Sequence, residues 1–317
     1  MKKYPKIVFM GSSSFSVVSL EEILRKKYNV IGVVTAPDHP SGRKQKKEKF
    51  SVKECAIKNH LALLQPKNLQ NTDFLEVLRS WKADIIVVVS YRKIPKCIWE
   101  LPPLGSFNLH ASLLPNYRGA APIQWVIMNG EKETGVSTLL LNDKIDTGEL
   151  LLQRKTFIGP KETAGDLYQR LANIGANAVI DTIQGIIENK IKPKPQSING
   201  TIKKAPKLFH RDGKINWKDS IETIYNKIRG LSPFLGAWTQ LMDNSGQKCK
   251  LKIYSANCIR EKHDITVGNI LIDNKYMKVS LKEGYISIVE AQIEGKRRIP
   301  VKDIINGMQG KNYTIIY

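Results

Sequence analysis

The first half of the chain alternates short, uniformly apolar runs with helical patterns, and this alternation restricts the fold more than any other feature. The runs are Lys6–Met10, Val30–Val34 and Asp84–Val89, and Ser106–His110 has the pattern of the end of a fourth strand. Runs without polar alternation are typical of strands buried on both faces, and strands separated by helices form parallel sheets. The sequence therefore predicts an α/β domain with a Rossmann-like, mostly parallel sheet. Ligands bind beyond the carboxyl ends of the strands in such sheets, so we expect the functional site there.

The pattern of apolar and polar residues changes in the second half of the chain, after a segment rich in proline and lysine. A helix is predicted from about Thr163, with Asp166 completing a capping box, to about Glu188. The Lys190–Pro195 segment cannot be helical throughout, because proline lacks the amide donor. Beyond a helix at Ile221–Leu231, short runs with alternating polarity predict a small β-barrel. These runs are Lys250–Tyr254, Tyr276–Ser280, Tyr285–Val289 and Asn312–Ile316. We expect a catalytic domain over 1–189, a linker over 190–206 and an OB-like barrel domain over 207–317.

Composition excludes several classes of protein and favours one class of binding partner. Of 317 residues, 42% are hydrophobic and 25% charged, as in ordinary soluble proteins. The longest strongly apolar stretch, Ile85–Val89, is far shorter than a membrane span, and the apolar run near the N-terminus is too short for a secretory leader. We therefore expect a cytoplasmic protein. The net charge of +21 favours polyanionic partners such as nucleic acid, although nucleotide bias in a genome can also produce a lysine-rich chain.

The cysteines give no sign of a metal site. Cys55, Cys97, Cys249 and Cys258 form no C-x-x-C pair and have no histidine at ligand spacing. We expect four free and mostly buried thiols, and no bound metal.

The candidate catalytic residues are Asn108, His110 and Asp146. Asn108 and His110 lie two apart near the end of a predicted strand, so their side chains leave the same face. Asp146 opens an Asp-Thr-Gly turn, from which a short carboxylate can reach a histidine and fix its tautomer. An amide, an imidazole and a carboxylate together suit acyl transfer. The alternative remains open, because a histidine at a strand end is often structural and Asp-Thr-Gly is also an ordinary turn sequence.

The same residues belong to a longer pattern that resembles the folate-dependent formyltransferase family. Its motif combines Asn-x-His, Ser-Leu-Leu-Pro and Asp-(Thr/Ala)-Gly, found here at Asn108–His110, Ser112–Pro115 and Asp146–Gly148. Arg118–Gln124 and Ser232–Trp238 extend the similarity over nearly the whole chain. Within the family, the sequence is most similar to the branch that formylates methionine on initiator tRNA.

The resemblance implies a donor, an acceptor and a set of contacts. The donor would be 10-formyltetrahydrofolate, and the acceptor the α-amino group of methionine on initiator methionyl-tRNA, with no membrane or protein partner and a monomeric chain. The implied catalytic residues are Asn108, His110 and Asp146. The implied folate contacts are Ser112, Leu113, Leu114, Pro115 and Tyr91. The implied tRNA contacts are the cations of a loop after the second strand, Arg43, Lys44, Lys46, Lys47 and Lys49, with a second, less specific patch at Lys203, Lys204 and Lys207.

Three segments depart from the family pattern. The first strand is followed by Gly11–Ser14 in place of Gly-Thr-Pro, and the third continues as Ser90-Tyr91-Arg92 in place of Ala-Tyr-Gly, which puts a cation near the expected folate pocket. The basic loop matches only loosely. These departures leave the three candidate catalytic residues untouched and bear on the folate contacts around Tyr91.

Other functions compete with this interpretation. An amino-sugar formyltransferase uses the same folate chemistry, but the basic loop and the Ala120-Ala121 pair argue against it. A glycinamide ribotide formyltransferase would have no use for the second domain. A nicotinamide dehydrogenase is poorly supported because G-x-G-x-x-G is missing after the first strand. A tRNA-binding protein with an inert first domain would not need the three candidate catalytic residues.

Overall fold

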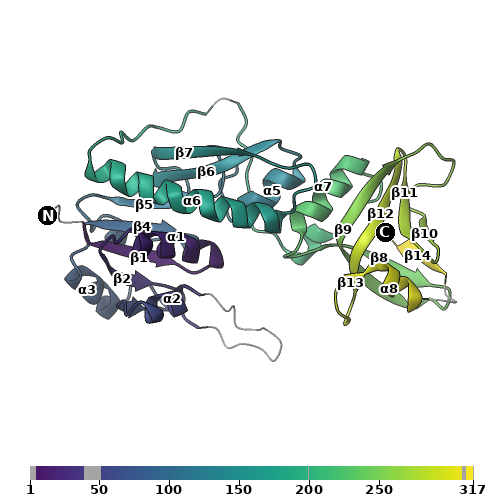
Figure 1. Cartoon of the computed structure of the whole chain (residues 1–317), viewed down its shortest axis with the longest axis horizontal. Helices are drawn as coiled ribbons and strands as arrows, with labels where there is room; N and C mark the ends of the chain where they lie inside the picture. The colour runs from purple at the N-terminus through teal and green to yellow at the C-terminus, as the bar shows by residue number, and fades with distance from the viewer. Residues whose placement is uncertain (1–4, 39–50, 199, 309–311, 317) are drawn as a thin grey trace. The chain divides into compact units, whose positions relative to one another are not determined.

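The computed structural model describes residues 5–38, 51–198, 200–308 and 312–316. The chain divides into two compact units that interleave along the sequence (Figure 1). The first unit takes residues 1–119, 133–157 and 168–205, and the second takes 120–132, 158–167 and 206–317. The boundaries predicted from the sequence, at residues 189 and 206, remain a prediction.

The first unit is built on a mostly parallel sheet, as predicted. Its strands are β1 (Ile7–Gly11), β2 (Val30–Val34), β3 (Leu63–Leu64), β4 (Ile85–Val89), β5 (Ser106–His110), β6 (Glu133–Leu140) and β7 (Leu150–Phe157). Their order is β3-β2-β1-β4-β5-β6-β7. Neighbours from β3 to β5 pair in parallel, and β6 and β7 add antiparallel strands at one edge. Because β1 pairs with both β2 and β4, the strand order reverses there, and the strand ends at this point are where such folds bind ligands.

Helices cover both faces of this sheet. The helices are α1 (Ser14–Arg25), α2 (Val52–Lys58), α3 (Thr72–Ser80), α4 (Lys96–Trp99) and α6 (Ala164–Ile187). Val8, Met10 and the other residues on their face of β1 and β4 pack against Phe74 of α3 and Ile98 of α4. On the other face, α1 and α6 lie side by side (Figure 1), and the Tyr168 hydroxyl of α6 accepts a hydrogen bond from the Phe15 amide at the start of α1. This arrangement explains why the strands are apolar on both sides.

The predicted capping box begins α6. The Thr163 amide donates to the Asp166 carboxylate at 3.0 Å, and the Asp166 amide donates to the Thr163 hydroxyl at 3.2 Å. The helix then runs from Ala164 to Ile187, which confirms the predicted range to within one residue at each end. The serine run after β1 has a similar use, since Ser13 caps α1 through a capping box with Ser16.

The second unit is an antiparallel barrel with helices beside it. Its elements are α5 (Pro122–Met128), a 3₁₀ helix (His210–Gly213), α7 (Ile221–Leu231), β8 (Ala237–Asp243), β9 (Lys248–Arg260), β10 (Ile270–Ile272), β11 (Met277–Leu281), β12 (Gly284–Ile293), β13 (Ile299–Pro300), α8 (Val301–Asn306) and β14 (Tyr313–Ile316). The strand order is β10-β11-β12-β9-β8-β14, with β13 on β12. The two end strands, β10 and β14, contact each other, so the sheet nearly closes as predicted for an OB-like barrel. Its core contains Trp217, which is fully buried and donates to the Thr239 hydroxyl at 3.0 Å.

One sequence-based expectation about the core is wrong. Of the four free cysteines, Cys55 is buried, Cys249 is half-buried, and Cys97 and Cys258 are exposed. Small apolar runs around a thiol do not determine whether its side chain faces inward, because that depends on the neighbouring elements. Among the described residues, no His, Cys, Asp and Glu side chains cluster as metal ligands would. None of the described helices is long and apolar enough to span a membrane.

Candidate active site

The site is built around the end of β5, where Asn108 and His110 point to one face of the sheet. Phe107 and Leu109 point the other way, and Leu109 packs against Gly175 of α6. Asn108 pairs in register with Val88 of β4, so it lies beside the point where the strand order reverses. Its side chain is half-buried and makes no hydrogen bond to any described residue. The Asn108 carboxamide is therefore free to donate to a substrate.

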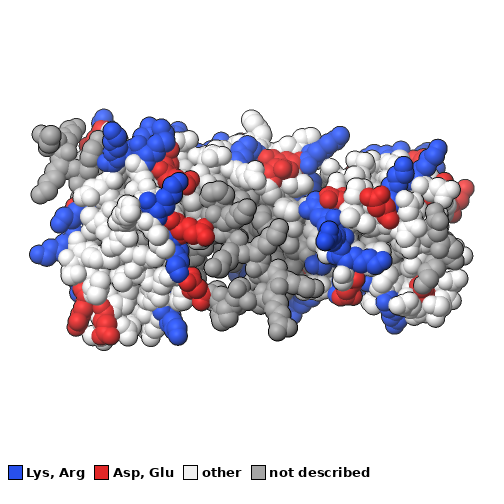
Figure 2. Space-filling model, turned by 60° about the horizontal axis from the view of Figure 1, so that its bottom comes forward, with Lys and Arg blue, Asp and Glu red and all other residues white. Residues whose placement is uncertain are grey.

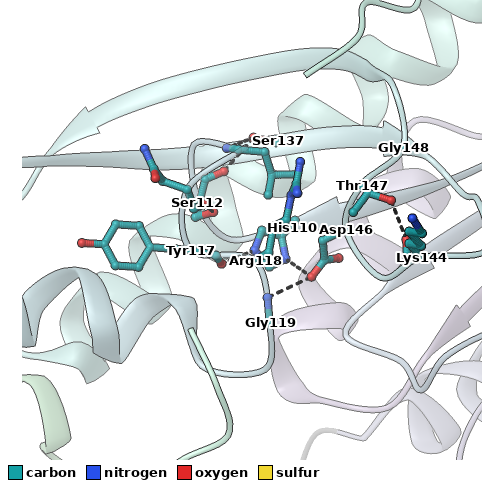
Figure 3. A network of polar contacts seen from close by, with 12 residues as sticks. His110, Ser112, Tyr117, Arg118, Gly119, Ser137, Lys144, Asp146, Thr147 and Gly148 are labelled. Carbon is teal, nitrogen blue, oxygen red and sulfur yellow. Dashed lines mark hydrogen bonds and ion pairs between the residues drawn. The ribbon is translucent and has the colours of Figure 1, made fainter. Parts of the chain in front are cut away.

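His110 is held from two sides. Its side chain is only 7% exposed. The Nε2 atom lies 2.8 Å from the main-chain oxygen of Tyr117, and because a carbonyl only accepts, Nε2 carries a hydrogen. The Nδ1 atom faces the Asp146 carboxylate, 3.6 Å from Oδ2, in an ion-pair contact that is too long for a hydrogen bond (Figure 3). The structure thus brings His110 and Asp146 together, as the hypothesis of a catalytic pair requires.

Asp146 lies in a constrained turn between β6 and β7. Its backbone has φ +55°, a left-handed conformation that short polar residues such as aspartate tolerate better than most others. Oδ2 accepts a hydrogen bond from the Gly119 amide at 3.0 Å, in addition to facing His110 (Figure 3). The carboxylate therefore links the turn at 146–148 to the loop that follows β5.

Two glycines allow close main-chain contacts in the turn at 146–148 and in the loop after β5. A side chain on Gly148 would place its Cβ 1.7 Å from the main-chain oxygen of Leu140. A side chain on Gly119 would meet the main-chain oxygen of Ala205 at 2.4 Å, and Gly119 also has φ +127°. Both positions therefore require glycine, which explains the glycine of the Asp-Thr-Gly turn in physical terms.

The predicted folate segment, Ser112–Pro115, lies directly after β5 and is tied to β6 and β7. Ser112 is fully buried and donates through its hydroxyl to the main-chain oxygen of Asn116 at 2.7 Å. The Ser137 hydroxyl donates to the oxygen of Ser112 at 2.7 Å, and Gln153 donates to the oxygen of Leu114 at 3.0 Å. Leu113 and Pro115 are half-buried, so they are the two members of the segment with surface left for a ligand.

Tyr91, the other predicted folate contact, lies beyond the end of β4 and is half-buried. Its hydroxyl donates weakly to the main-chain oxygen of Thr35, at 3.4 Å. Burial raises the pKa of the Tyr91 phenol, and the nearby Arg92 acts in the opposite direction. The Arg92 guanidinium donates to the main-chain oxygens of Pro66 and Lys67 and lies 5.5 Å from the centre of the Tyr91 ring. The unexpected cation is thus engaged by the loop after β3.

The predicted tRNA-binding cations fall into two groups. Arg43, Lys44, Lys46, Lys47 and Lys49 lie outside the described residues. Lys203, Lys204 and Lys207 are exposed. Figure 2 shows Lys and Arg side chains spread over the face in view, with fewer Asp and Glu side chains among them.

The second unit carries a surface of aromatic rings and cations, of which only Lys207 was predicted from the sequence as a tRNA contact. Phe209 is 50% exposed, and Lys207 and Arg211 lie over its ring at 5.7 and 5.6 Å. His210 stacks on Trp238 with ring centres 5.0 Å apart, and Lys250 lies 4.9 Å from the centre of the Trp238 ring.

His210 lies in a cationic environment. Desolvation, Lys250 and Lys252 lower the pKa of His210, which favours the uncharged ring. We call the residues Lys207, Phe209, His210, Arg211, Trp238 and Lys250 the aromatic–cationic surface. Stacking platforms combined with cations are typical of proteins that bind single-stranded nucleic acid. The residues come from β8, β9 and the segment before α7, so no local sequence motif could have identified the set.

The chain matches known proteins over almost its whole length. Residues 5–183 match the formyl transferase family, and residues 207–309 match the formyl transferase C-terminal domain. A methionyl-tRNA formyltransferase of Flavobacterium johnsoniae is 44% identical over 312 residues, which is 98% of this chain and 99% of the relative. A methionyl-tRNA formyltransferase of Bacteroides thetaiotaomicron is 38% identical over 308 residues, which is 96% of each chain.

Solved structures share the fold at lower identity. An N-formyltransferase from Helicobacter canadensis, solved with folinic acid and dTDP-3-aminofucose, superposes with a TM-score of 0.67 at 24% identity, covering 91% of this chain and 99% of that one. HypX from Aquifex aeolicus, solved with tetrahydrofolic acid, superposes with a TM-score of 0.66 at 17% identity, covering 97% of this chain and 48% of that one. The full-length identity to the curated relatives and the two matching domain families lead to one conclusion: the chain belongs to the methionyl-tRNA formyltransferase family.

Proposed function

We propose that this chain transfers the formyl group of 10-formyltetrahydrofolate to the α-amino group of methionine on initiator tRNA. The observation that carries the proposal is the Asn108, His110 and Asp146 cluster at the end of β5, in a chain 44% identical over nearly its full length to a methionyl-tRNA formyltransferase. The folate compounds in related solved structures support a folate donor.

The reaction replaces one bond to the formyl carbon with another. The amine nitrogen forms a bond to the formyl carbon, the bond from that carbon to the folate nitrogen breaks, and a proton of the amine moves to the folate nitrogen. The amine must attack in its neutral form. Free α-amino groups have a pKa of about 7.7 to 8.0, and the neighbouring ester lowers it further, so deprotonation needs little assistance. The principal barrier is the negative charge that develops on the formyl oxygen.

Asn108, His110 and Asp146 have complementary roles in this chemistry. The unbonded Asn108 carboxamide donates to the formyl oxygen as its charge develops. His110 leaves the same face of β5, and its Nδ1 atom, the ring nitrogen that is not bound to Tyr117, is the atom that takes up and releases the proton. The Asp146 carboxylate, 3.6 Å from Nδ1, supplies the compensating charge for an imidazolium. Leu113, Pro115 and Tyr91 border the end of the sheet where the folate would bind.

The tRNA would be held by positive charge and by stacking. The loop cations Arg43, Lys44, Lys46, Lys47 and Lys49 suit phosphate contacts near the acceptor end. The aromatic–cationic surface in the barrel unit suits contact with phosphates and unpaired bases. The net charge of +21 assists association with any polyanion, so it supports the choice of a tRNA acceptor without identifying which tRNA is used.

The experiment that tests the function is an assay with labelled formyl-folate and three acceptors. We expect rapid transfer to initiator Met-tRNA and none to an amino-sugar nucleotide or to glycinamide ribotide. Transfer to the amino sugar in preference to Met-tRNA would overturn the proposal, and so would an absence of transfer to any of the three. An elongator Met-tRNA serves as a fourth acceptor that measures discrimination among tRNAs.

A further inference from the structure

Both groups that hold His110 are themselves held by the same segment, residues 192–198 and 200–205, which we call the linker segment. Tyr117, whose oxygen accepts from His110, donates through its amide to the main-chain oxygen of Lys203 at 2.6 Å. Asp146, whose carboxylate faces His110, accepts through its main-chain oxygen from the Gln196 side chain at 2.9 Å. The linker segment therefore contacts both residues that hold the imidazole.

Gln196 makes the connection to the Asp146 turn. Its Nε2 atom donates to the main-chain oxygens of Asp146 at 2.9 Å and Gly148 at 2.8 Å. Its Oε1 atom accepts from the Arg118 guanidinium, at 2.6 Å from Nη2 and 3.2 Å from Nε. Arginine only donates, so the atom facing Arg118 must be the oxygen, and the two carbonyls face the nitrogen. Every strong hydrogen-bonding group of the amide is therefore used.

The hydrogen bonds from Gln196 hold the part of the turn that contains the left-handed residue Asp146. Asp146 has φ +55°, a conformation that costs free energy unless the surroundings hold it. Gln196 holds the oxygens on both sides of Thr147, while the main chain of Lys194 pairs with that of Leu150 at 2.7 and 2.9 Å, just beyond the turn. Without the amide, the Asp146 carboxylate would keep its bond to Gly119 but lose the constraint on its backbone.

We propose that Gln196 is a positioning residue, which sets the orientation of Asp146 toward His110 by holding the turn at 146–148. The inference rests on the proposed function, because it concerns the geometry of the same site. Gln196 does not act on the formyl group or the amine, and its removal changes the rate of the chemical step through Asp146. Misplacement of a catalytic group by about 1 Å can cost on the order of 100-fold in rate.

The test compares Gln196→Met with Gln196→Glu and with Ser197→Ala. Methionine has a similar length and makes none of the four hydrogen bonds. Glutamate keeps an acceptor for Arg118 but presents a second oxygen to the two carbonyls, so it isolates the donor half of the amide. Ser197 is exposed in the same segment and makes no hydrogen bond to a described residue, so Ser197→Ala is the matched control.

Three measurements are needed: kcat and KM with formyl-folate and Met-tRNA, the ¹⁵N chemical shifts of the His110 ring, and the urea midpoint. We expect both Gln196 variants to lower kcat by on the order of 10-fold to 100-fold, with KM for tRNA within about 2-fold of the parent. We expect the His110 ring resonances to move in both variants and to stay in place in Ser197→Ala.

An unchanged kcat, or unmoved His110 resonances, in folded Gln196→Met would overturn the positioning role. A lower urea midpoint with unchanged kcat would assign Gln196 to stability alone and would also overturn it. The proposed function is tested separately, by transfer from formyl-folate to Met-tRNA in the parent chain. If the parent shows no transfer, the His110 ring resonances still test the positioning role of Gln196. If Gln196→Met does not fold, Gln196→Glu decides by the same criteria.

Discussion

Nδ1 of His110 lies 3.6 Å from Oδ2 of Asp146, although one residue ends β5 and the other lies in the turn between β6 and β7. In the antiparallel pairing of β5 with β6, His110 lies opposite Ser137, whereas Leu140, where β6 ends, lies opposite Phe107, so the turn after β6 folds back along β5 to reach the imidazole. Gly148 lets the turn fold closely against Leu140, Gly119 lets the loop after β5 pass close to Ala205, and the Gly119 amide donates to the same carboxylate oxygen.

Removal of the negative charge at this pair should impair the reaction without unfolding the turn. Asp146→Asn keeps an oxygen for the Gly119 amide, and asparagine tolerates the left-handed backbone at this position. We expect kcat to fall by roughly 100-fold, the order of effect for one electrostatic group in such a site. Single-turnover formylation measures it, with Asp143→Asn, on the exposed part of the same loop, as the control. A kcat within about 2-fold of the parent would mean that His110 needs no anion.

The Asn108 carboxamide should stabilise the transition state as much as one oxyanion-hole donor typically does. Asn108→Ala is expected to lower kcat by roughly 10² to 10³, or about 3 to 4 kcal/mol in transition-state stabilisation, while tRNA affinity stays unchanged. Turnover is measured with saturating tRNA, and affinity by filter binding. Asn173→Ala, on the exposed surface of α6, is the control for the same substitution. Near-normal turnover in Asn108→Ala would exclude the donor role.

Gly119 should resist substitution for reasons of backbone conformation and space together. An alanine there must adopt φ +127° and would place Cβ 2.4 Å from the oxygen of Ala205. We expect Gly119→Ala to lower the free energy of unfolding by about 1 to 3 kcal/mol and to reduce turnover. Urea unfolding followed by circular dichroism measures the stability. In Gly307→Ala, φ is −82° and the nearest atom is 3.5 Å away, so we expect almost no change in that control.

The basic loop should contribute to tRNA binding through phosphate contacts. Changing Lys46, Lys47 and Lys49 to alanine should flatten the plot of log K against log salt, by about 0.7 to 0.9 per lost contact. The control changes Lys26, Lys27 and Lys58, which are exposed and alter the net charge equally. If the plots for the two triple variants have the same slope, the loop makes no specific contact with the tRNA phosphates.

The exposed ring of the aromatic–cationic surface should matter for tRNA and not for folate. Phe209→Ala removes a half-exposed ring that lies beneath Lys207 and Arg211, and we expect tRNA affinity to fall by roughly 10-fold, the cost of one lost stacking contact. KM for formyl-folate should not change. Phe157→Ala, with a ring 78% exposed in the sheet unit, is the control. Equal effects of the two substitutions would contradict a binding role for Phe209.

Local sequence patterns determined several of the strands and helices. Val30–Val34 forms a strand with the predicted bounds, a strand ends at His110 as predicted, and Ile221–Leu231 forms the predicted helix. Each depends on neighbours along the chain: an apolar run for Val30–Val34, alternating residues for Ser106–His110, and a cap with a helical period for the helix. The spacing of Asn108 and His110 likewise determined that both leave one face of β5, since successive side chains of a strand alternate.

The tertiary structure alone decided how those residues are held. His110 is bound by the main-chain oxygen of Tyr117, and Asp146 by the amide of Gly119 and the side chain of Gln196. Every residue carries a main-chain carbonyl and nearly every residue an amide. The residue type therefore does not show which carbonyl or amide will hold a catalytic side chain. The same limit applies to the exposed Cys97 and Cys258 and to Trp238, which stacks on His210 from a segment distant in sequence. Patterns of neighbours encode the elements, whereas contacts between distant segments exist only once the chain has packed.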